Sequence, residues 1–147
     1  MFGSERAGYF LGVSAEEWQQ IAERGYGAWT RRDLDGLLET LAPDIVFRTS
    51  GMFPGLEAEY RSHDGMRRFW AQLQEPWESF AMEATAIDAR GDAAVIDIHF
   101  HAVGRESGVE VELDVFHALR KREGLVTELS SFSTREEALA SLEPYIS

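Results

Sequence analysis

Two consecutive runs of alternating apolar and polar residues constrain the fold of this chain more than any other feature of its sequence. The first run spans residues 94–103, the second spans 108–119, and the glycine-containing segment 104–108 joins them. Successive side chains of a β-strand point to opposite faces of a sheet, so each run predicts a strand with one apolar face. Together the runs predict an antiparallel hairpin with its turn at 104–108.

The register of this hairpin follows from matching its two faces. Pairing His99 with Asp114 keeps polar residues together, whereas a shift of one residue would turn every side chain of one strand to the wrong face. The same register places Ile96 opposite His117. One face is then an apolar wall with a single titratable group, His117, and the other is a ladder of acids and histidines.

Helices precede most of the strands in the rest of the chain. Helical spacing predicts helices over 14–32, 34–41, 64–75 and 134–142, and alternation predicts further strands near 45–49, 78–89 and 125–132. Helices followed by an antiparallel meander are typical of an α+β fold. We therefore predict a cone-shaped barrel, in which three helices pack on a strongly curved antiparallel sheet and enclose a pocket.

The expected domain boundaries follow from local signals. Ser14 and Glu17 form a capping box that predicts the start of the first helix, and Asp64 is expected to cap the third. Residues 1–13 are rich in glycine and lack a period. We expect a flexible N-terminal arm over 1–13 and one domain over 14–147.

Charge and composition argue against several classes of function. The formal net charge is −12, which disfavours nucleic acid and anionic membrane surfaces as partners, because both attract basic surfaces. Cysteine is absent, which removes disulfides and thiolate chemistry. The chain shows neither an apolar run of ~18 residues nor a secretory signal, so we expect no membrane span and a cytoplasmic location.

Several segments of the chain resemble one known superfamily. They are 26–36, 41–47, 60–70, 104–112, 122–126 and 135–139. On these segments the chain resembles the nuclear transport factor 2-like superfamily, which has the cystatin-like fold, and within it the SnoaL-like group. That group includes polyketide cyclases and is related to ketosteroid isomerases and limonene-epoxide hydrolases. The resemblance implies a small-molecule pocket and a homodimer through the convex sheet face, where Phe116 and Phe132 are expected to point outward.

The catalytic residues of the related isomerases are matched only in part. A ketosteroid isomerase uses a carboxylate base on its first strand, with a tyrosine and a protonated aspartate as an oxyanion hole. The resemblance places Thr49, which cannot act as that base, at the first position. It places His117 at the aspartate if the turn at 122–124 is one residue shorter, and the tyrosine near Tyr26 but one residue out of register. Steroid isomerisation by the known mechanism is therefore disfavoured.

His117 and Tyr26 are the candidate catalytic residues. An imidazole has an ordinary pKa of ~6.5, and burial in an apolar wall lowers that pKa and favours a neutral base. Tyr26 is a candidate hydrogen-bond donor to a ligand oxygen. The alternative interpretation is structural: His117 is a core histidine bonded to Tyr26 or to a backbone carbonyl.

A pocket between sheet and helices would be lined by the apolar faces of both. The candidate ligand-binding residues are Trp29, Phe47, Thr49, Met66, Phe69, Trp70, Ile98, Phe100, Leu129 and Ser131. Apolar walls with a few hydroxyls are typical of small-molecule sites. For the apolar residues the alternative is ordinary core packing, and for the hydroxyls it is relief of crowding at the narrow end of the cone.

The polar face of the hairpin invites a metal-site interpretation. His99, His101 and Asp114 share that face, and histidine and carboxylate groups are ligands of zinc and iron. However, the apolar face must pack on the helices, which leaves this set on the outer surface as cross-strand charge pairs. We therefore expect no metal and no cofactor.

These observations favour a small-molecule pocket protein that acts as a cofactor-independent acid–base enzyme. It would be an isomerase, cyclase or hydrolase on a small apolar or polyketide-, terpenoid- or steroid-like ligand. One alternative is a ligand-binding protein or dimeric scaffold without chemistry, which the missing carboxylate at Thr49 favours. Another is a protein that recognises a partner protein through Phe116 and Phe132.

Overall fold

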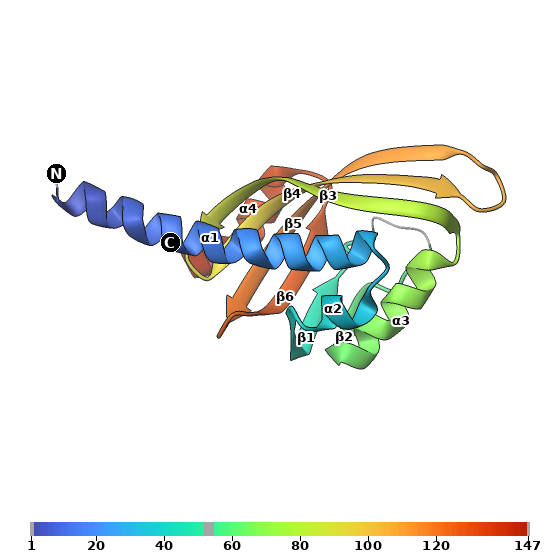
Figure 1. Ribbon diagram of the computed structural model, residues 1–147, viewed down its shortest axis with the longest axis horizontal. Coiled ribbons are helices and arrows are strands. Elements are labelled where there is room, and N and C mark those ends of the chain that lie inside the picture. The colour runs from blue at the N-terminus through green and yellow to red at the C-terminus, as the bar shows by residue number, and fades with distance from the viewer. Residues whose placement is uncertain (1, 52–54, 147) are drawn as a thin grey trace.

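The computed structural model describes the backbone of residues 2–51 and 55–146 and the side chains of 15–51 and 55–146 (Figure 1). Its elements are α1 (Phe2–Thr30), α2 (Leu34–Leu38), β1 (Leu41–Arg48), β2 (Glu59–Arg61), α3 (Ser62–Gln74), β3 (Trp77–Arg90), β4 (Ala93–Gly104), β5 (Glu110–Arg122), β6 (Leu125–Phe132) and α4 (Arg135–Ile146). The expected α+β class is confirmed. No helix within the described ranges is long and apolar enough to cross a membrane.

Six strands form one sheet in the order β2-β1-β6-β5-β4-β3. Neighbouring strands are antiparallel except β1 and β6, which run parallel. The sheet is therefore mixed, whereas we expected a wholly antiparallel one. The predicted register of the long hairpin is confirmed, with His99 opposite Asp114 and Ile96 opposite His117. The short strand β2 is not among the predicted strands, because three residues are too few to show alternation. Their pairing with β1 identifies them as a strand.

The helices divide between the two faces of the sheet. We call the face that carries Ile96 and His117 the inner face, and the face that carries His99 and Asp114 the outer face. α1, α2 and α3 lie on the inner side and α4 lies on the outer side (Figure 1). The expected layer of three helices is therefore present, and a fourth helix covers part of the opposite face.

α4 changes the interpretation of the outer face. Its Ala138 and Leu142 are buried against β4 and β5 in a second, smaller apolar cluster. Phe116 and Phe132, expected to point outward as a free surface, are half-buried beside this cluster. These two rings therefore pack within the chain, and a homodimer through the remaining outer face stays a prediction.

The first helix begins earlier than its capping signal. α1 starts at Phe2 and runs through the capping box, so the expected start at Ser14 is wrong. No proline interrupts residues 2–30, so the helix can continue on the N-terminal side of Ser14. A capping side chain does not by itself prevent this continuation. In Figure 1 the first turns of α1 extend beyond the sheet. The flexible arm over 1–13 stays a prediction.

Asp33 and Asp64 lie near the starts of the next two helices, but only Asp33 acts as a cap. Asp33 caps α2 as its carboxylate accepts from the backbone N–H of Gly36 at 3.0 Å. α3 begins at Ser62 and not at Asp64, whose carboxylate accepts instead from Arg67 at 2.7 Å. The expected cap at Asp64 is therefore wrong, because this residue already lies within the first turn of the helix.

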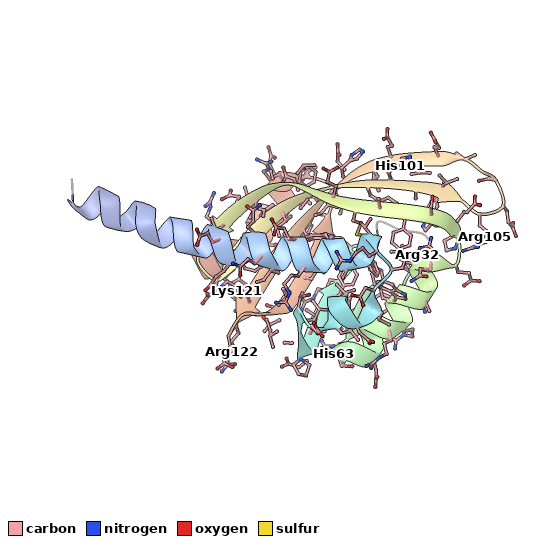
Figure 2. All side chains as sticks on the ribbon, in the orientation of Figure 1. Arg32, His63, His101, Arg105, Lys121 and Arg122 are labelled. Carbon is pink, nitrogen blue, oxygen red and sulfur yellow. The ribbon has the colours of Figure 1, made fainter. Side chains whose placement is uncertain are left out.

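α1 is held on the sheet by contacts at its middle. Trp18 is fully buried, and its indole N–H donates to the carbonyl of Gly91 at 3.0 Å. Lys121 of β5 (Figure 2) lies over the Trp18 ring and donates to the carboxylates of Glu17 at 2.6 Å and Asp92 at 3.3 Å. These contacts fix where the C-terminal half of α1 lies on the inner face.

Candidate functional site

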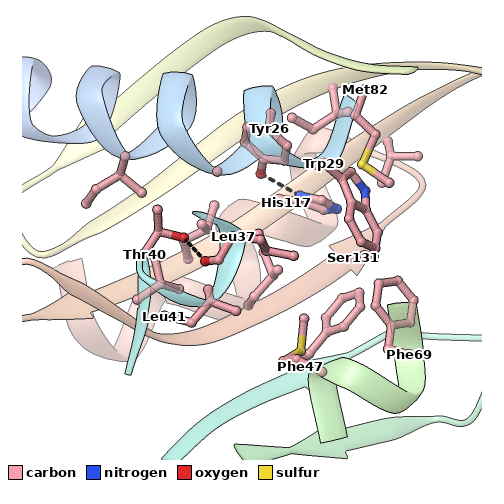
Figure 3. Close-up of a pocket in the computed structure, with 18 of the residues that line it drawn as sticks. Tyr26, Trp29, Leu37, Thr40, Leu41, Phe47, Phe69, Met82, His117 and Ser131 are labelled. Carbon is pink, nitrogen blue, oxygen red and sulfur yellow. Dashed lines mark hydrogen bonds between the residues drawn. The ribbon is translucent and has the colours of Figure 1, made fainter. Parts of the chain in front are cut away.

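A cavity of about 70 Å³ lies between the inner face of the sheet and the helices that cover it (Figure 3). Ten of the twelve expected site residues line this cavity. They are Tyr26, Trp29, Phe47, Met66, Phe69, Ile98, Phe100, His117, Leu129 and Ser131. Of the described lining residues, none is Asp, Glu, Lys or Arg. The volume is below the ~300–1,000 Å³ of most ligand sites, so the cavity suits a small molecule unless flexible side chains move.

Thr49 and Trp70 are the two expected residues that do not line the cavity. Thr49 follows the end of β1, is buried, and donates its hydroxyl proton to the carbonyl of Glu57 at 2.8 Å. Trp70 packs against Trp29 with ring centroids 4.4 Å apart. Thr49 therefore holds the loop after β1, and Trp70 supports a lining residue without reaching the cavity.

The cavity also contains residues that the sequence interpretation did not select. They are Ile21, Gly25, Leu37, Thr40, Leu41, Leu73, Met82, Val115, Leu119 and Val126. A signal existed for several of them, since Val115 shares the strand face of His117 and Ile21 shares the helical stripe of Trp29. Thr40 has no such signal, because its position depends on the turn between α2 and β1.

Aromatic rings from α1, β1 and β2 pack around Phe69 of α3. Trp29 stacks on Phe69 with ring centroids 5.4 Å apart, and Phe47 meets it edge-on at 4.6 Å. Tyr60 lies at 5.1 Å on another side. Offset and edge-on contacts of this kind restrain the rings, so this wall of the cavity is preformed.

One hydrogen bond joins the two titratable groups of the lining. The hydroxyl of Tyr26 on α1 lies 2.6 Å from Nδ1 of His117 on β5 (Figure 3). Burial lowers the pKa of His117 to about 4 and raises the pKa of the Tyr26 hydroxyl far above its usual range. Both groups are therefore neutral near pH 7. This hydrogen bond to Tyr26 is the one expected if His117 is a structural core histidine. The imidazole ring nevertheless also lines the cavity.

The two neutral groups define the direction of this hydrogen bond. A phenol has one proton to donate, and within the described residues His117 Nδ1 is the partner of the Tyr26 hydroxyl. The hydroxyl donates to Nδ1, which leaves the imidazole proton on Nε2. Within residues 15–51 and 55–146, Nε2 has no hydrogen-bond partner. The ring thus offers a neutral N–H donor on the edge opposite Tyr26.

Ser131 lies directly opposite His117 on the neighbouring strand β6. It is 1% exposed, and its hydroxyl has no partner among the described residues. In contrast, the buried hydroxyls of Thr40 and Thr49 each donate to a backbone carbonyl. A buried hydroxyl without a partner costs ~1–3 kcal/mol. The Ser131 hydroxyl is therefore available to a partner in the cavity that this residue lines.

A family model for the SnoaL-like domain matches residues 22–129, which is more than half of the chain. The chain belongs to the SnoaL-like family. The match confirms the resemblance to the nuclear transport factor 2-like superfamily. The matched range of this SnoaL-like chain includes Tyr26 and His117 and ends two residues before Ser131. Comparison of the sequence with curated proteins finds no match.

Solved structures share the fold of the SnoaL-like chain. TerC, co-crystallised with polyporic acid, matches with a TM-score of 0.70 at 20% identity, over 84% of this chain and 96% of that chain. A nuclear transport factor 2-like protein of unknown function from Burkholderia pseudomallei matches with a TM-score of 0.73 at 22% identity, over 86% and 95%. A putative SnoaL-like polyketide cyclase from a Jannaschia species matches with a TM-score of 0.65 at 17% identity, over 90% of each chain. At these identities the likeness shows the fold alone.

The outer face of the SnoaL-like chain carries cross-strand charge pairs. His99 places Nδ1 at 3.0 Å from Asp114 and Nε2 at 3.4 Å from Glu112. These hydrogen bonds, the one to Asp114 first, raise the pKa of His99. His101 lies opposite Glu112 on the same ladder. In the part of the chain that the structure describes, no group of three or more His, Cys, Asp or Glu side chains has the geometry of a metal site.

Proposed function

We propose that this SnoaL-like protein binds a small, uncharged and mostly apolar organic molecule in the cavity. The observation that supports the proposal most directly is the character of the lining, which is apolar except for a few neutral polar groups. A buried ion would need a compensating charge, and the described lining residues provide none. TerC, which shares the fold, has been co-crystallised with polyporic acid, and this is consistent with an organic ligand.

The cavity volume narrows the ligand class. About 70 Å³ is too small for a steroid-sized ring system without movement of the walls. Met66 and Met82 line the cavity, and their flexible side chains are the ones most able to move. We therefore propose a compact ligand of polyketide or terpenoid type in preference to a steroid.

We further propose cofactor-independent acid–base chemistry with His117 as the reacting group. With its pKa lowered to about 4, His117 is neutral near pH 7, and its Nδ1 accepts from Tyr26, so the ring acts through Nε2 as a neutral N–H donor. Enolisation during isomerisation or cyclisation, and attack of water during ester hydrolysis, each place developing negative charge on a carbonyl oxygen, which such a donor stabilises. In enolisation, solvent water takes up the carbon-bound proton. The hydroxyl proton of Tyr26 is used by His117, so Tyr26 acts by orienting the imidazole and not as the expected direct donor to the ligand.

Exchange of carbon-bound protons with deuterated solvent tests this proposal. The probe is cyclopentanone, whose protons beside the carbonyl exchange through an enol, and NMR follows both exchange and binding. We expect the wild-type protein to bind cyclopentanone and to accelerate exchange, and the His117→Gln variant to bind it with the acceleration lost. The matched control is His63→Gln, because His63 hydrogen-bonds the backbone carbonyl of Leu41 and does not line the cavity. Equal acceleration by the wild type and His117→Gln would contradict the role of His117.

A ligand-binding protein without chemistry is the second candidate, and one observation favours it. Tyr26 and His117 are the titratable groups among the described lining residues, and no lining carboxylate is present to raise the basicity of the imidazole. This candidate predicts binding of cyclopentanone by the wild type with no acceleration of exchange. The same experiment therefore separates the two functions.

A further inference from the structure

We propose that Ser131 and His117 together bind one carbonyl oxygen of an uncharged ligand, so that Ser131 determines the specificity of the cavity. This inference rests on the proposed binding function. It adds the functional group that the cavity selects, and it assigns a role to a residue that lies outside the part of the chain matched by the family model.

The two groups are placed to act on a single atom. Ser131 and His117 are directly paired across the antiparallel strands β5 and β6, and both side chains line the cavity. Side chains directly opposite each other on such strands have Cβ atoms ~4.5–5.5 Å apart. An atom in front of the pair is therefore within hydrogen-bond reach of both the serine hydroxyl and the imidazole.

Each of the two groups has one donor available. With the Tyr26 hydroxyl assigned as the donor to Nδ1 of His117, its partner among the described residues, the ring proton is placed on Nε2. The Ser131 hydroxyl is 1% exposed and has no partner among the described residues. The other lining hydroxyls already donate, that of Tyr26 to His117 and that of Thr40 to the carbonyl of Leu37. The unused donors of the described lining are thus gathered at one cross-strand pair.

A carbonyl oxygen fits two converging donors better than other common groups. It has two lone pairs and no proton, so it can accept from Ser131 and from His117 at the same time. A carboxylate would need a positive charge, and an ammonium group would need acceptors or a negative charge; the described lining residues carry no such charges. A hydrocarbon would leave both donors without a partner. A ligand hydroxyl can accept from one group and donate to the other, and this possibility is separated by experiment.

The experiment compares two probes of almost the same shape. Cyclopentanone carries the carbonyl oxygen, and methylenecyclopentane carries a CH₂ group in its place. Affinities for the wild type, Ser131→Ala and Ser130→Ala are measured by NMR titration of the protein. Ser130 is the matched control, because it neighbours Ser131 on β6 but lines the groove beside α4 on the outer face.

We expect the wild type to bind cyclopentanone more tightly than methylenecyclopentane. Ser131→Ala is expected to weaken cyclopentanone binding about 3- to 10-fold, the loss typical of one hydrogen bond, and to leave the alkene unchanged. Ser130→Ala is expected to change neither affinity. In the wild type, cyclopentanone and not the alkene should also shift the Nε2 proton resonance of His117, which a structural role of Ser131 alone would not produce.

The outcomes separate this inference from the proposed function. Equal affinity of the wild type for both probes, or equal effects of the two serine variants, would overturn the role of Ser131 and leave the binding function standing. Tighter binding of cyclopentanol than of cyclopentanone would overturn the choice of a carbonyl group. Binding of neither probe would overturn the proposed function itself. Thermal unfolding of each variant verifies that the affinities refer to folded protein.

Discussion

Acid is expected to destabilise this protein through His117, and the His117→Gln variant isolates the effect. In the unfolded chain the imidazole takes up a proton near pH ~6.5, whereas burial lowers its pKa to about 4 in the folded protein. Between these values the unfolded state binds more protons than the folded state, so the free energy of unfolding decreases as the pH falls. The contribution of His117 is fully present above about pH 6.5 and is lost as the pH falls to about 4.

The magnitude follows from the size of the pKa difference. The step from 6.5 to about 4 spans roughly 2.5 units, and each unit corresponds to ~1.36 kcal/mol, which gives about 3 kcal/mol. Glutamine carries no titratable group and retains a polar atom that can meet the Tyr26 hydroxyl. The free energy of unfolding of His117→Gln should therefore lack this part of the pH dependence.

Urea denaturation followed by tryptophan fluorescence at pH 7.5, 6, 5 and 4 measures the effect. The quantity of interest is the difference between wild type and variant, because the 26 acidic residues titrate in both proteins and their contribution cancels. We expect the wild type to lose about 3 kcal/mol more than the variant between pH 6.5 and 4. A difference that does not change with pH would show that the folded protein protonates His117 as easily as the unfolded chain does, and would refute its burial in an apolar wall.

His99→Gln provides a control of opposite sign. Hydrogen bonds to Asp114 and Glu112 raise the pKa of His99, so the stability it contributes is present below its unfolded pKa. That stability is lost as the pH rises through the raised, folded pKa. The side chain is 37% exposed, so solvent screening keeps the effect small.

Three further predictions concern the cavity. Gly25→Ala is expected to raise the free energy of unfolding by ~1 kcal/mol, since its new Cβ would lie 3.5 Å from Thr40 without a clash, and to weaken cyclopentanone binding by filling cavity space. Gly27→Ala, which is off the cavity, should show a similar gain in thermal unfolding once the flexible Arg31 guanidinium, 2.8 Å from the new Cβ, moves aside, without the loss of affinity. Equal affinities of the two variants for cyclopentanone would contradict the argument. Ser131→Ala should raise the stability of the ligand-free protein by up to ~1 kcal/mol in urea denaturation, and a clear loss would show that the hydroxyl has a partner. Long-range ¹H–¹⁵N NMR of the imidazole should show His117 protonated on Nε2 at pH 7, and a proton on Nδ1 would reverse the assigned direction of the Tyr26 hydrogen bond.

Strand pairing was the most predictable part of this protein. A strand has a side-chain period of two, so the apolar faces of the two long runs allow one register, and the structure has that register. The same period placed His117 and Ser131 on the inner face before any contact was known. The order of helices and strands predicted the α+β class, and the family model confirms the SnoaL-like resemblance.

Helix ends were less predictable, because a capping signal reports only on a few neighbouring residues. Asp33 caps α2, but α1 continues through Ser14 to begin at Phe2, and Asp64 lies inside α3. A capping side chain stabilises a helix start where the chain enters the helix there. Whether it does so depends on the residues before it and on what the preceding turn packs against.

The sequence by itself determined which side chains share a face of a strand or a stripe of a helix, because those sets depend only on backbone periodicity. Tertiary structure alone decided which partner each side chain meets. In the structure the Thr49 hydroxyl bonds a backbone carbonyl and the Tyr26 hydroxyl bonds His117, whereas the Ser131 hydroxyl has no partner among the described residues. Helix α4 packs beside Phe116 on a face expected to be open. These contacts join residues far apart in the chain, and their geometry is set by how whole elements pack, which local periodicity does not encode.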